Sequence, residues 1–258
     1  MPQMIDFTPK GAIFDVDDTL LDNYPKTHNL GLHEHARLLA LREIGERHDI
    51  AALAEVSEEQ NRTVIQRAVE HSIEGGTWQL FYELGMVDSP TIDHGNQLLK
   101  EVAARKHELY EPIMCEFGAP LPKAIEFVKA MYVLTDGRIA IASGAQRADV
   151  RAFLRMSGME ALFEERRVIT REDFGRAKPD PESFETAFQT LGLPDEDRSA
   201  VLAFEDDPKG VASAKQAGLY VCAITSRFTD AELVSHEDKP DLVQASYVAF
   251  AATLGITL

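Results

Sequence analysis

The chain has 258 residues, of which 45% are hydrophobic and 27% charged, and its formal net charge at pH 7 is −17. This length and composition are ordinary for a globular protein, built either as one large domain or as a core with an insertion. The acidic balance disfavours nucleic acid and anionic membrane surfaces as partners. It does not exclude a small phosphorylated substrate, because local cations decide the binding of a small anion.

The sequence also limits the cellular compartment. No apolar run approaches the roughly 20 residues that span a bilayer, and the N-terminus lacks the basic and apolar stretches of a signal peptide. The two cysteines, Cys115 and Cys222, lie far apart and neither belongs to a Cys-x-x-Cys spacing. We therefore expect a cytoplasmic protein without a zinc site or a disulfide framework. The sequence does not indicate the oligomeric state.

Residues 11–22 give the first structural signal, because the apolar run Ala12-Ile13-Phe14 leads directly into a group of acids. A short apolar run of this kind is typical of a strand buried on both faces of a parallel sheet. Asp15 and Asp17 are two residues apart, so their side chains point to the same side of an extended chain. Two carboxylates about 5 Å apart repel by roughly 3 kcal/mol at an effective dielectric near 20. Such a pair indicates a bound cation, a shared proton or catalysis.

Two other interpretations of these acids were considered. A single Asp after a strand is often only a helix cap or an Asx-turn. A calcium loop also begins Asp-x-Asp, but it requires an acid or Asn at its fifth position and Gly at its sixth. Those positions hold Thr19 and Leu20, which excludes a calcium loop.

From about residue 25 to residue 110 the sequence has helical periodicity and no strand signal. Apolar residues recur three and four apart over residues 32–44, and Ser57-Glu-Glu-Gln60 predicts a capping box at the start of a second helix. We expect Gly75-Gly76-Thr77 to interrupt the helical pattern and the last long helix of this stretch to end near Pro112.

From Pro120 onwards helices and strands alternate. Apolar strands are predicted at residues 138–142, 168–169, 200–204, 220–224 and 242–243. Strands separated by helices indicate a parallel sheet covered on both faces. The predicted fold is therefore α/β, a Rossmann-like doubly wound parallel sheet with an inserted all-helical cap domain. Residues 1–22 and 112–258 form the predicted core, and residues 23–111 form the predicted cap, a lid over the carboxyl end of the first strand.

Four features at strand ends then occur in a characteristic order: Asp15-x-Asp17-x-Thr19, Ser143, Lys178-Pro179 and Glu205-Asp206. Each alone has an ordinary explanation as a cap, a turn or a surface residue, but their order and positions are specific. The sequence resembles the haloacid dehalogenase superfamily, in the branch with a helical cap after the first motif. It is most similar to the β-phosphoglucomutase-like phosphatases.

This resemblance implies a magnesium-dependent phosphatase acting on a small phosphate ester. Asp15 is the implied nucleophile, forming an aspartyl-phosphate, and Asp17 the acid and base. The implied Mg²⁺ ligands are the carboxylates of Asp15 and Asp206 and the main-chain carbonyl of Asp17, with Glu205 either a direct ligand or a neighbour of the ligands. Ser143 and Lys178 are implied to hold phosphoryl oxygens, helped by backbone N–H groups at Asp17-Asp18 and Ser143-Gly144. Asp207 is expected either to cap the following helix or to lie beside the metal ligands without binding the ion.

The resemblance also ranks the alternatives. Dehalogenases of this superfamily lack an acid two residues after the nucleophile, so Asp17 disfavours carbon–halogen cleavage. Relatives similar to phosphonoacetaldehyde hydrolase need a cap lysine, and neither Lys26 nor Lys100 has the matching context. True β-phosphoglucomutases carry a cap histidine one residue away from His28, together with Arg and Lys motifs that are not found here. A phosphomutase is thus the second interpretation, and a non-catalytic binding protein with the same fold is the third.

Substrate choice is expected to depend on the cap. Arg62, Arg67, His71 and Trp78 flank Gly75-Gly76, so a loop at this point would bring them to the site. The alternative is that they are solvated helix faces and one core tryptophan. His33 and His35 are two residues apart on a predicted helix and do not face one another, which argues against a metal site there.

Overall fold

We analysed a computed structural model of the full chain, which describes residues 5–25, 29–69, 72–235 and 237–258. The chain forms two compact units, and we describe each by itself. The first consists of residues 1–22 and 119–258, and the second of residues 23–118. The second crossing of the chain between the units therefore falls at Gly118 and Ala119, a little later than the predicted boundary at residues 111 and 112.

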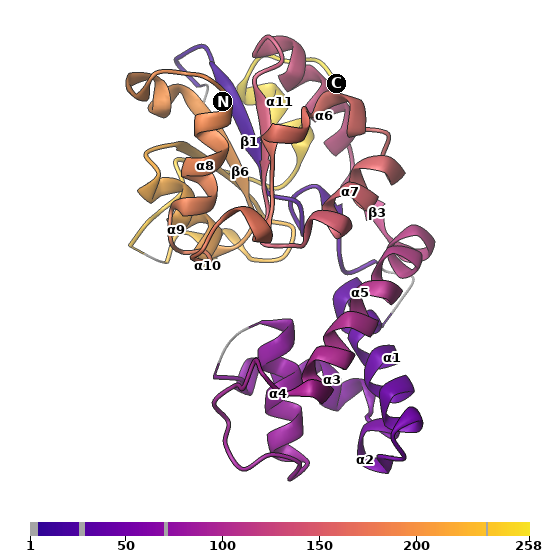
Figure 1. Cartoon of the computed structure of the whole chain (residues 1–258). Helices are drawn as coiled ribbons and strands as arrows, with labels where there is room; N and C mark the ends of the chain where they lie inside the picture. Colours follow the sequence, from indigo (N-terminus) through magenta and orange to yellow (C-terminus); the bar gives the residue numbers. More distant parts are fainter. Residues whose placement is uncertain (1–4, 26–28, 70–71, 236) are drawn as a thin grey trace. The chain divides into compact units, whose positions relative to one another are not determined.

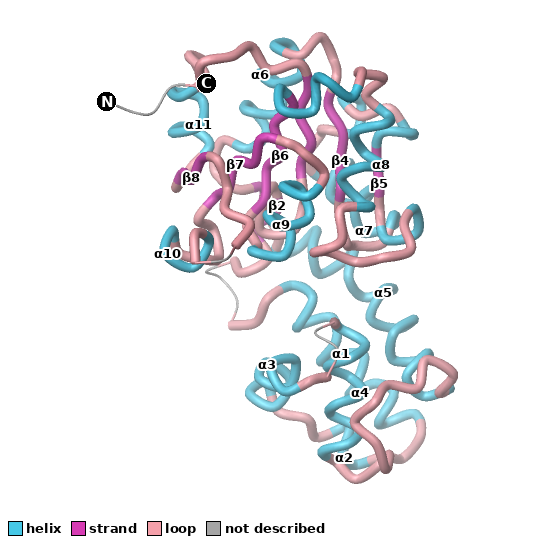
Figure 2. The backbone as a smooth tube through the Cα atoms, turned by 90° about the vertical axis from the view of Figure 1, so that its left-hand side faces the viewer, coloured by secondary structure: helices cyan, strands magenta, loops and turns pink. Residues whose placement is uncertain are grey.

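The first unit contains a parallel sheet of six strands with the order β5-β4-β1-β6-β7-β8 (Figure 1 labels β1 and β6, and Figure 2 labels the other strands). The strands are β1 (Gly11–Phe14), β4 (Ile139–Ala142), β5 (Val168–Ile169), β6 (Val201–Glu205), β7 (Tyr220–Ile224) and β8 (Leu242–Gln244). The chain runs outwards from β1 to β4 and β5, and then returns to β6 on the other side of β1. The sheet is doubly wound as predicted, and its order reverses between β1 and β6, where such folds bind ligands.

Helices cover both faces of this sheet (Figures 1 and 2). Side chains alternate along each strand, so Ile13 of β1 packs into one core with α8 and α9. Phe14, its neighbour, stacks on Phe204 with ring centroids 4.8 Å apart, in an aromatic group with residues of α6 and α11. The helices of this unit are α6 (Ala124–Leu134), α7 (Arg147–Met156), α8 (Glu182–Thr190), α9 (Pro208–Gln216), α10 (Asp230–Leu233) and α11 (Tyr247–Thr253). The two packed layers fix the central strands and hence their carboxyl ends.

The described residues of the second unit form helices joined by turns and no strand, as predicted. Its helices are α1 (Leu32–Arg47), α2 (Ala51–Ala54), α3 (Glu58–Arg67), α4 (Ile73–Glu83) and α5 (Gln97–Phe117). Ser57 caps α3 by accepting a hydrogen bond from the Gln60 N–H, and the Gln60 side-chain oxygen accepts one from the Ser57 N–H. This pair of bonds confirms the predicted capping box. No helix in the described part of the chain combines the length and apolar composition needed to cross a membrane.

Two predicted interruptions of these helices are wrong. Gly75 and Gly76 lie inside α4 and are buried, because Arg37 of α1 fills the space that a side chain at residue 76 would need. A Cβ at Gly76 would lie 2.6 Å from Arg37 Nη1. Pro112 lies inside α5, which continues to Phe117. Packing within the unit thus outweighs the helix-breaking tendency of these residues.

A pair of two-residue strands was not predicted. β2 (Leu21–Asp22) pairs antiparallel with β3 (Ala119–Pro120), with Leu21 opposite Pro120 and Asp22 opposite Ala119. Segments of two residues carry no periodicity, so the sequence gives no signal for them. This pair joins the two places where the chain leaves and re-enters the first unit.

Candidate active site

Three acids meet at the carboxyl ends of the two central strands. The N–H of Asp15, the first residue after β1, donates to the Phe204 carbonyl of β6 at 3.0 Å, which extends the pairing of the two strands by one residue. Glu205 ends β6 and Asp206 follows it. One carboxylate oxygen from each of Asp15, Glu205 and Asp206 lies within 4.8 Å of the others, and all three residues are buried.

Lys178 reaches into this group from the segment before α8. Its Nζ donates to Asp15 Oδ1 at 2.7 Å, to Glu205 Oε1 at 2.6 Å and to the Ala142 carbonyl at 3.0 Å. These partners come from the ends of β1, β6 and β4, so the three donor positions of the ammonium are used. Lys178 therefore joins three strand ends that are distant in sequence, and it is not the solvated surface residue that a lone lysine usually is.

Glu205 is held in a fixed orientation by its own neighbours. Its Oε2 accepts the N–H groups of Asp206 and Asp207 at 2.9 and 3.1 Å, while Oε1 accepts from Lys178. The carboxylate also lies directly against Gly210 of α9, where a Cβ would come within 1.8 Å of Oε1. Both oxygens are thus engaged by protein donors, which favours Glu205 as the group that positions Lys178 over Glu205 as a metal ligand.

Burial and crowding perturb the ionisation of these groups. Burial raises the pKa of the Asp15 carboxyl well above its ordinary value; the Lys178 ammonium opposes the rise, and the carboxylates of Glu205 and Asp17 add to it. Burial, followed by the charges of Glu205 and Asp15, likewise raises the pKa of Asp206. Burial disfavours the charged form of Lys178, but Asp15 and Glu205 outweigh it and raise its pKa. One ammonium thus faces three carboxylates, so negative charge is in excess.

The donor set suits a hard divalent cation. Its side-chain donors are carboxylate oxygens only, and no sulfur or imidazole belongs to the described group of Asp15, Glu205 and Asp206. Mg²⁺ and Ca²⁺ prefer such oxygen ligands, whereas Zn²⁺ in proteins is mostly bound by nitrogen and sulfur. A cation between Asp15 and Asp206 would favour the ionised form of both carboxyls and so lower the pKa values that burial and the neighbouring carboxylates raise. The residues present therefore fit a site for a hard divalent cation, a class to which Mg²⁺ belongs.

Ser143 and Gly144 follow β4 at the same edge of the sheet. The Ser143 N–H donates to the Ile169 carbonyl of β5 at 3.0 Å. The Ser143 hydroxyl oxygen accepts the N–H of Ala145 at 3.1 Å, so its own proton stays available for donation. Gly144 is exposed, and a Cβ there would have no atom within 4 Å. Ser143 is buried and Gly144 beside it is exposed, so the loop places a hydroxyl just below open backbone, and a hydroxyl and a backbone N–H can together hold an anion.

Asp17 and Asp18 lie in the turn after Asp15. Asp17 is half-buried, and its carboxylate acts electrostatically on Asp15. Asp18 is buried and has a left-handed backbone with φ of 56°. Its N–H donates to the Leu21 carbonyl at 2.8 Å, so in this structure the Asp18 N–H of the predicted phosphate cradle is engaged within the turn. The Asp18 carboxylate instead lies 3.9 Å from the guanidinium of Arg227.

Two further residues hold the turn after β1, and sequence reasoning gave them no role. Thr19, whose side chain is buried, donates its hydroxyl to Asp206 Oδ1 at 3.2 Å. The hydroxyl of Tyr247, on α11, donates to the Thr19 carbonyl at 2.8 Å. Thr19 belongs to the Asp-x-Asp-x-Thr motif, so the motif itself could have indicated a role for it in the site. Tyr247 was not, because its contact joins residues at opposite ends of the sequence.

The candidate substrate-selecting residues of the helical unit have structural roles in their own unit. Arg67 forms an ion pair with Glu83, Arg62 donates to the Asn29 carbonyl, and Trp78 is buried with its Nε1–H on the Ser89 carbonyl. The interpretation as helix faces and a core tryptophan is thus confirmed for these three. The candidates Lys26, His28 and His71 lie outside the described residues.

Two histidines of α1 contact aromatic rings, His33 by stacking and His35 in a tilted arrangement. His33 lies parallel to Tyr110 with ring centroids 4.1 Å apart, and His35 lies 5.7 Å from Phe117. Both aromatic partners belong to α5, so the histidines contribute to the packing of the two longest helices in the unit.

Comparison with known proteins identifies the family. A family model for haloacid dehalogenase-like hydrolases matches residues 9–218. The chain belongs to this family. The family predicted from the four motifs is thereby confirmed. The match extends over the segments that carry Asp15, Ser143, Lys178 and Asp206.

Individual relatives are similar to this chain either over a part of their length or at low sequence identity. The chain is 38% identical to the protein CbbY of Rhodobacter capsulatus over 112 residues, which is 42% of this chain and 48% of that protein. It is 24% identical to the fructose-1-phosphate phosphatase YqaB of Escherichia coli, over 81% of this chain and 93% of that protein. The aligned region spans only about a third to a half of the first curated relatives.

The fold has close structural counterparts. A family IA hydrolase of Entamoeba histolytica superposes with a TM-score of 0.68 at 19% identity, covering 93% of this chain and 94% of that chain. The doubly wound fold with added helices is therefore shared with solved members of the family.

Proposed function

We propose that this hydrolase is a magnesium-dependent phosphatase that cleaves a small phosphate monoester through an aspartyl-phosphate intermediate. The observation that carries the proposal is the position of Lys178, whose ammonium bonds both Asp15 and Glu205 beside Asp206 at the reversal point of the sheet. This arrangement combines a nucleophile, a fixed cation and a carboxylate pair for a metal ion within one buried site. Such a combination serves phosphoryl transfer, in which charge on phosphoryl oxygens must be stabilised.

Asp15 is the proposed nucleophile. One of its carboxylate oxygens attacks phosphorus while the bond from phosphorus to the ester oxygen breaks, and the alcohol leaves. Water then attacks the same phosphorus, inorganic phosphate departs, and the Asp15 carboxylate is regenerated. Splitting the hydrolysis into two displacements replaces one very slow step with two faster ones.

Asp17 is the proposed acid and base. It gives its proton to the departing ester oxygen in the first step and removes a proton from the attacking water in the second. Help of this kind contributes about 10²- to 10⁴-fold to a rate. Asp17 is half-buried and follows the nucleophile by two residues, and it lies near enough for its charge to help raise the pKa of Asp15.

Magnesium is the proposed cofactor. We assign the carboxylates of Asp15 and Asp206 and the main-chain carbonyl of Asp17 as its protein ligands, with Glu205 holding Lys178 beside them. When bound, magnesium supplies positive charge to the acids and to the phosphoryl oxygens. The Lys178 ammonium, the Ser143 hydroxyl and the Gly144 N–H are the proposed contacts to the phosphoryl group. We omit the Asp18 N–H from this set because it already donates to Leu21.

The substrate class is a small phosphorylated metabolite. In support, a relative aligned over most of its length is named a fructose-1-phosphate phosphatase. We propose residues 23–118 as the substrate-selecting domain, because they are inserted directly after the turn that carries Asp15 and Asp17. We also propose a cytoplasmic location, supported by the free thiols of Cys115 and Cys222.

The proposal is tested by a hydrolysis screen over sugar phosphates, nucleotides and phosphoglycolate, with and without magnesium. We expect phosphate release from at least one ester only when magnesium is present. The variant Asp15→Asn should lose turnover and keep its thermal midpoint, while Asp17→Asn should turn over slowly, most slowly with alkyl leaving groups. Absence of turnover on every ester with magnesium present would contradict the proposal.

Phosphomutase activity remains the second candidate, and one experiment separates the two. β-Glucose 1-phosphate is supplied with a bisphosphate primer, and the products are followed over time. A phosphatase releases free phosphate, whereas a mutase accumulates the 6-phosphate. We expect free phosphate, because the Arg and Lys cap motifs of the mutases are not found in the sequence.

A further inference from the structure

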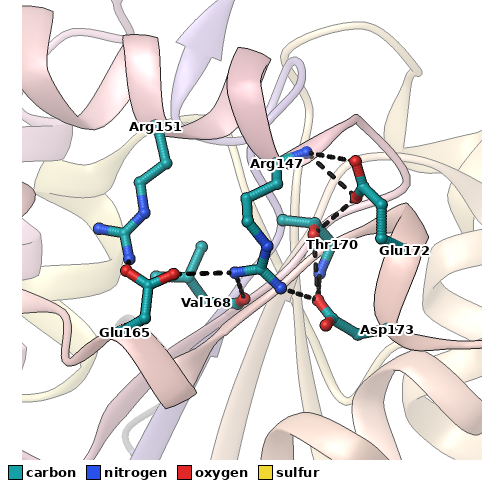
Figure 3. Close-up of polar contacts among 7 residues, drawn as sticks. All are labelled: Arg147, Arg151, Glu165, Val168, Thr170, Glu172 and Asp173. Carbon is teal, nitrogen blue, oxygen red and sulfur yellow. Dashed lines mark hydrogen bonds and ion pairs between the residues drawn. The ribbon is translucent and has the colours of Figure 1, made fainter.

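A network of charged groups ties the loop after β4 to the segment after β5 (Figure 3). We call residues 143–147 the Ser143 loop, since it begins with Ser143 and ends where α7 starts at Arg147. The Arg147 guanidinium donates from Nη1 to the Val168 carbonyl at 3.1 Å and to Glu165 at 3.3 Å, and from Nη2 to Asp173. Its backbone N–H lies 3.1 Å from both oxygens of Glu172. Arg147 therefore meets the neighbouring segment with its side chain and its backbone.

The partners of Arg147 are themselves fixed by Thr170, the residue that follows β5. Thr170 is fully buried, and its N–H donates to Asp173 Oδ2 at 2.8 Å. Its hydroxyl lies 2.8 Å from Glu172 and 3.0 Å from Asp173, so the single hydroxyl proton serves one of the two carboxylates at a time. Glu172 and Asp173 are thus held at the positions where Arg147 meets them, which Figure 3 shows for the whole group.

The Ser143 loop is attached to the same segment at two more points. The Ser143 N–H donates to the Ile169 carbonyl, and the Arg171 N–H donates to the Ala145 carbonyl, each at 3.0 Å. Gly144 lies between these attachments and has no side chain to pack. The loop is therefore fixed at its start, its middle and its end, and the end is held by Arg147.

An ordinary surface ion pair would not have this effect, and the same helix offers one for comparison. Arg151 lies one turn further along α7 and forms an ion pair with Glu165. Glu165 belongs to the short helix η2 (Glu165–Arg167), and it meets the Ser143 loop through Arg147 Nη1 at 3.3 Å. The Arg151 side chain is half-buried, but Glu165 is exposed, and pairs with such an exposed partner usually contribute little to stability. Arg147 differs because its partners Glu172 and Asp173 also hold Thr170, next to the backbone that binds Ser143.

We propose that Arg147 is a positioning residue, which holds the Ser143 hydroxyl and the Gly144 N–H at the place where they bind the phosphoryl group. This inference rests on the proposed function, in which those two groups contact phosphoryl oxygens. Loss of the guanidinium removes the side-chain bonds of Arg147 to Asp173 and Val168. The bond from the Arg147 backbone N–H to Glu172 remains. The loop then samples positions away from the one that fits the anion, and misplacement by about 1 Å costs up to 10²-fold in rate.

The test compares Arg147→Ala and Arg147→Lys with Arg151→Ala as the matched control. For each variant, kcat and KM are measured on the best ester from the screen, with inorganic phosphate as competitive inhibitor. We expect Arg147→Ala to lower kcat/KM by about 10- to 100-fold and to weaken phosphate inhibition to a similar degree. Arg147→Lys should recover part of the loss, because it keeps the charge and loses the planar fork. Arg151→Ala should stay within about twofold of the wild type.

Thermal unfolding with orthovanadate, a probe for the phosphoryl site, separates this inference from the proposed function. Arg147→Ala should keep most of its thermal midpoint without ligand and lose most of the rise that orthovanadate causes in the wild type. Equal losses of kcat/KM in Arg147→Ala and Arg151→Ala, or unchanged phosphate inhibition in Arg147→Ala, would overturn the role of Arg147 alone. A wild type that hydrolyses no ester yet binds orthovanadate would overturn the proposed function and leave this test valid. A wild type that does neither would overturn both.

Discussion

The contact between Gly210 and Glu205 makes a sharp prediction for the variant Gly210→Ala. A methyl group at residue 210 would lie 1.8 Å from Glu205 Oε1, 2.0 Å from its Cδ and 2.3 Å from Oε2. Ordinary contact distances are near 3.5 to 4 Å, so the carboxylate has to retreat by more than about 1 Å. That movement breaks the 2.6 Å bond to Lys178 and the bonds from the Asp206 and Asp207 N–H groups.

The size of the effect follows from these bonds. Each hydrogen bond to a charged group contributes about 1.5–3 kcal/mol, and a buried donor left without a partner costs about 1–3 kcal/mol. Alanine is favoured over glycine inside a helix by about 1 kcal/mol, which offsets part of the loss. We expect Gly210→Ala to lower the free energy of unfolding by at least about 3 kcal/mol. Because Lys178 is displaced, kcat/KM should also fall by about 10²-fold.

The assay combines urea unfolding with steady-state kinetics on the same preparations. The control is Gly175→Ala, because a Cβ there would meet its nearest atom, Glu182 Oε2, at an ordinary distance of 3.7 Å. This control should keep the stability and kcat/KM of the wild type. If Gly210→Ala kept both as well, Glu205 would not be held as described and its role in positioning Lys178 would be refuted.

Three further predictions concern the charge balance of the site and the core of the helical unit. Without magnesium, Lys178→Met should lower the free energy of unfolding by about 3 kcal/mol, since it leaves buried carboxylates unpaired. Urea unfolding with and without magnesium measures this loss, and we expect the metal to restore part of it. Equal losses under both conditions would contradict the prediction. In the wild type, magnesium should raise the thermal midpoint because it binds the folded state. The variant Asp206→Asn should lose most of that rise. A full rise in this variant would exclude Asp206 as a ligand. Gly76→Ala should destabilise the protein by about 1–2 kcal/mol in urea unfolding, because the new methyl group overlaps Arg37 and Ile65. An increase in stability would mean that the higher helix propensity of alanine outweighs this overlap.

The sequence predicted the parts of the fold that depend on local pattern. The apolar runs ending in Asp15 and in Glu205 indicated buried strands, and their order placed both acids at one edge of the sheet. The packing partners were not predictable in this way. Gly76 looks like a helix breaker until Arg37 is known to occupy the space of its missing side chain.

The same limit applies within the site. The motifs identified Lys178, but its simultaneous bonds to Asp15, Glu205 and the Ala142 carbonyl depend on three strand ends meeting in space. The Asp18 N–H was expected to face the phosphate, yet a left-handed turn directs it to Leu21. Backbone direction in a turn follows from the local hydrogen bonds and is not visible in residue type alone.

The small pairing of β2 with β3 has a consequence for how such a protein changes in evolution and in the laboratory. The paired residues Asp22 and Ala119 lie side by side, at the roughly 5 Å spacing of opposed strands, and the whole helical unit is inserted between them. An insert of any length fits there without moving the central strands, provided that its two ends lie close together. Exchange of residues 23–118 for another module, or for a short hairpin loop, thus leaves Asp15, Lys178 and Asp206 on an unaltered scaffold. The junction thus makes the proposed substrate-selecting unit replaceable while the proposed reacting groups stay in place.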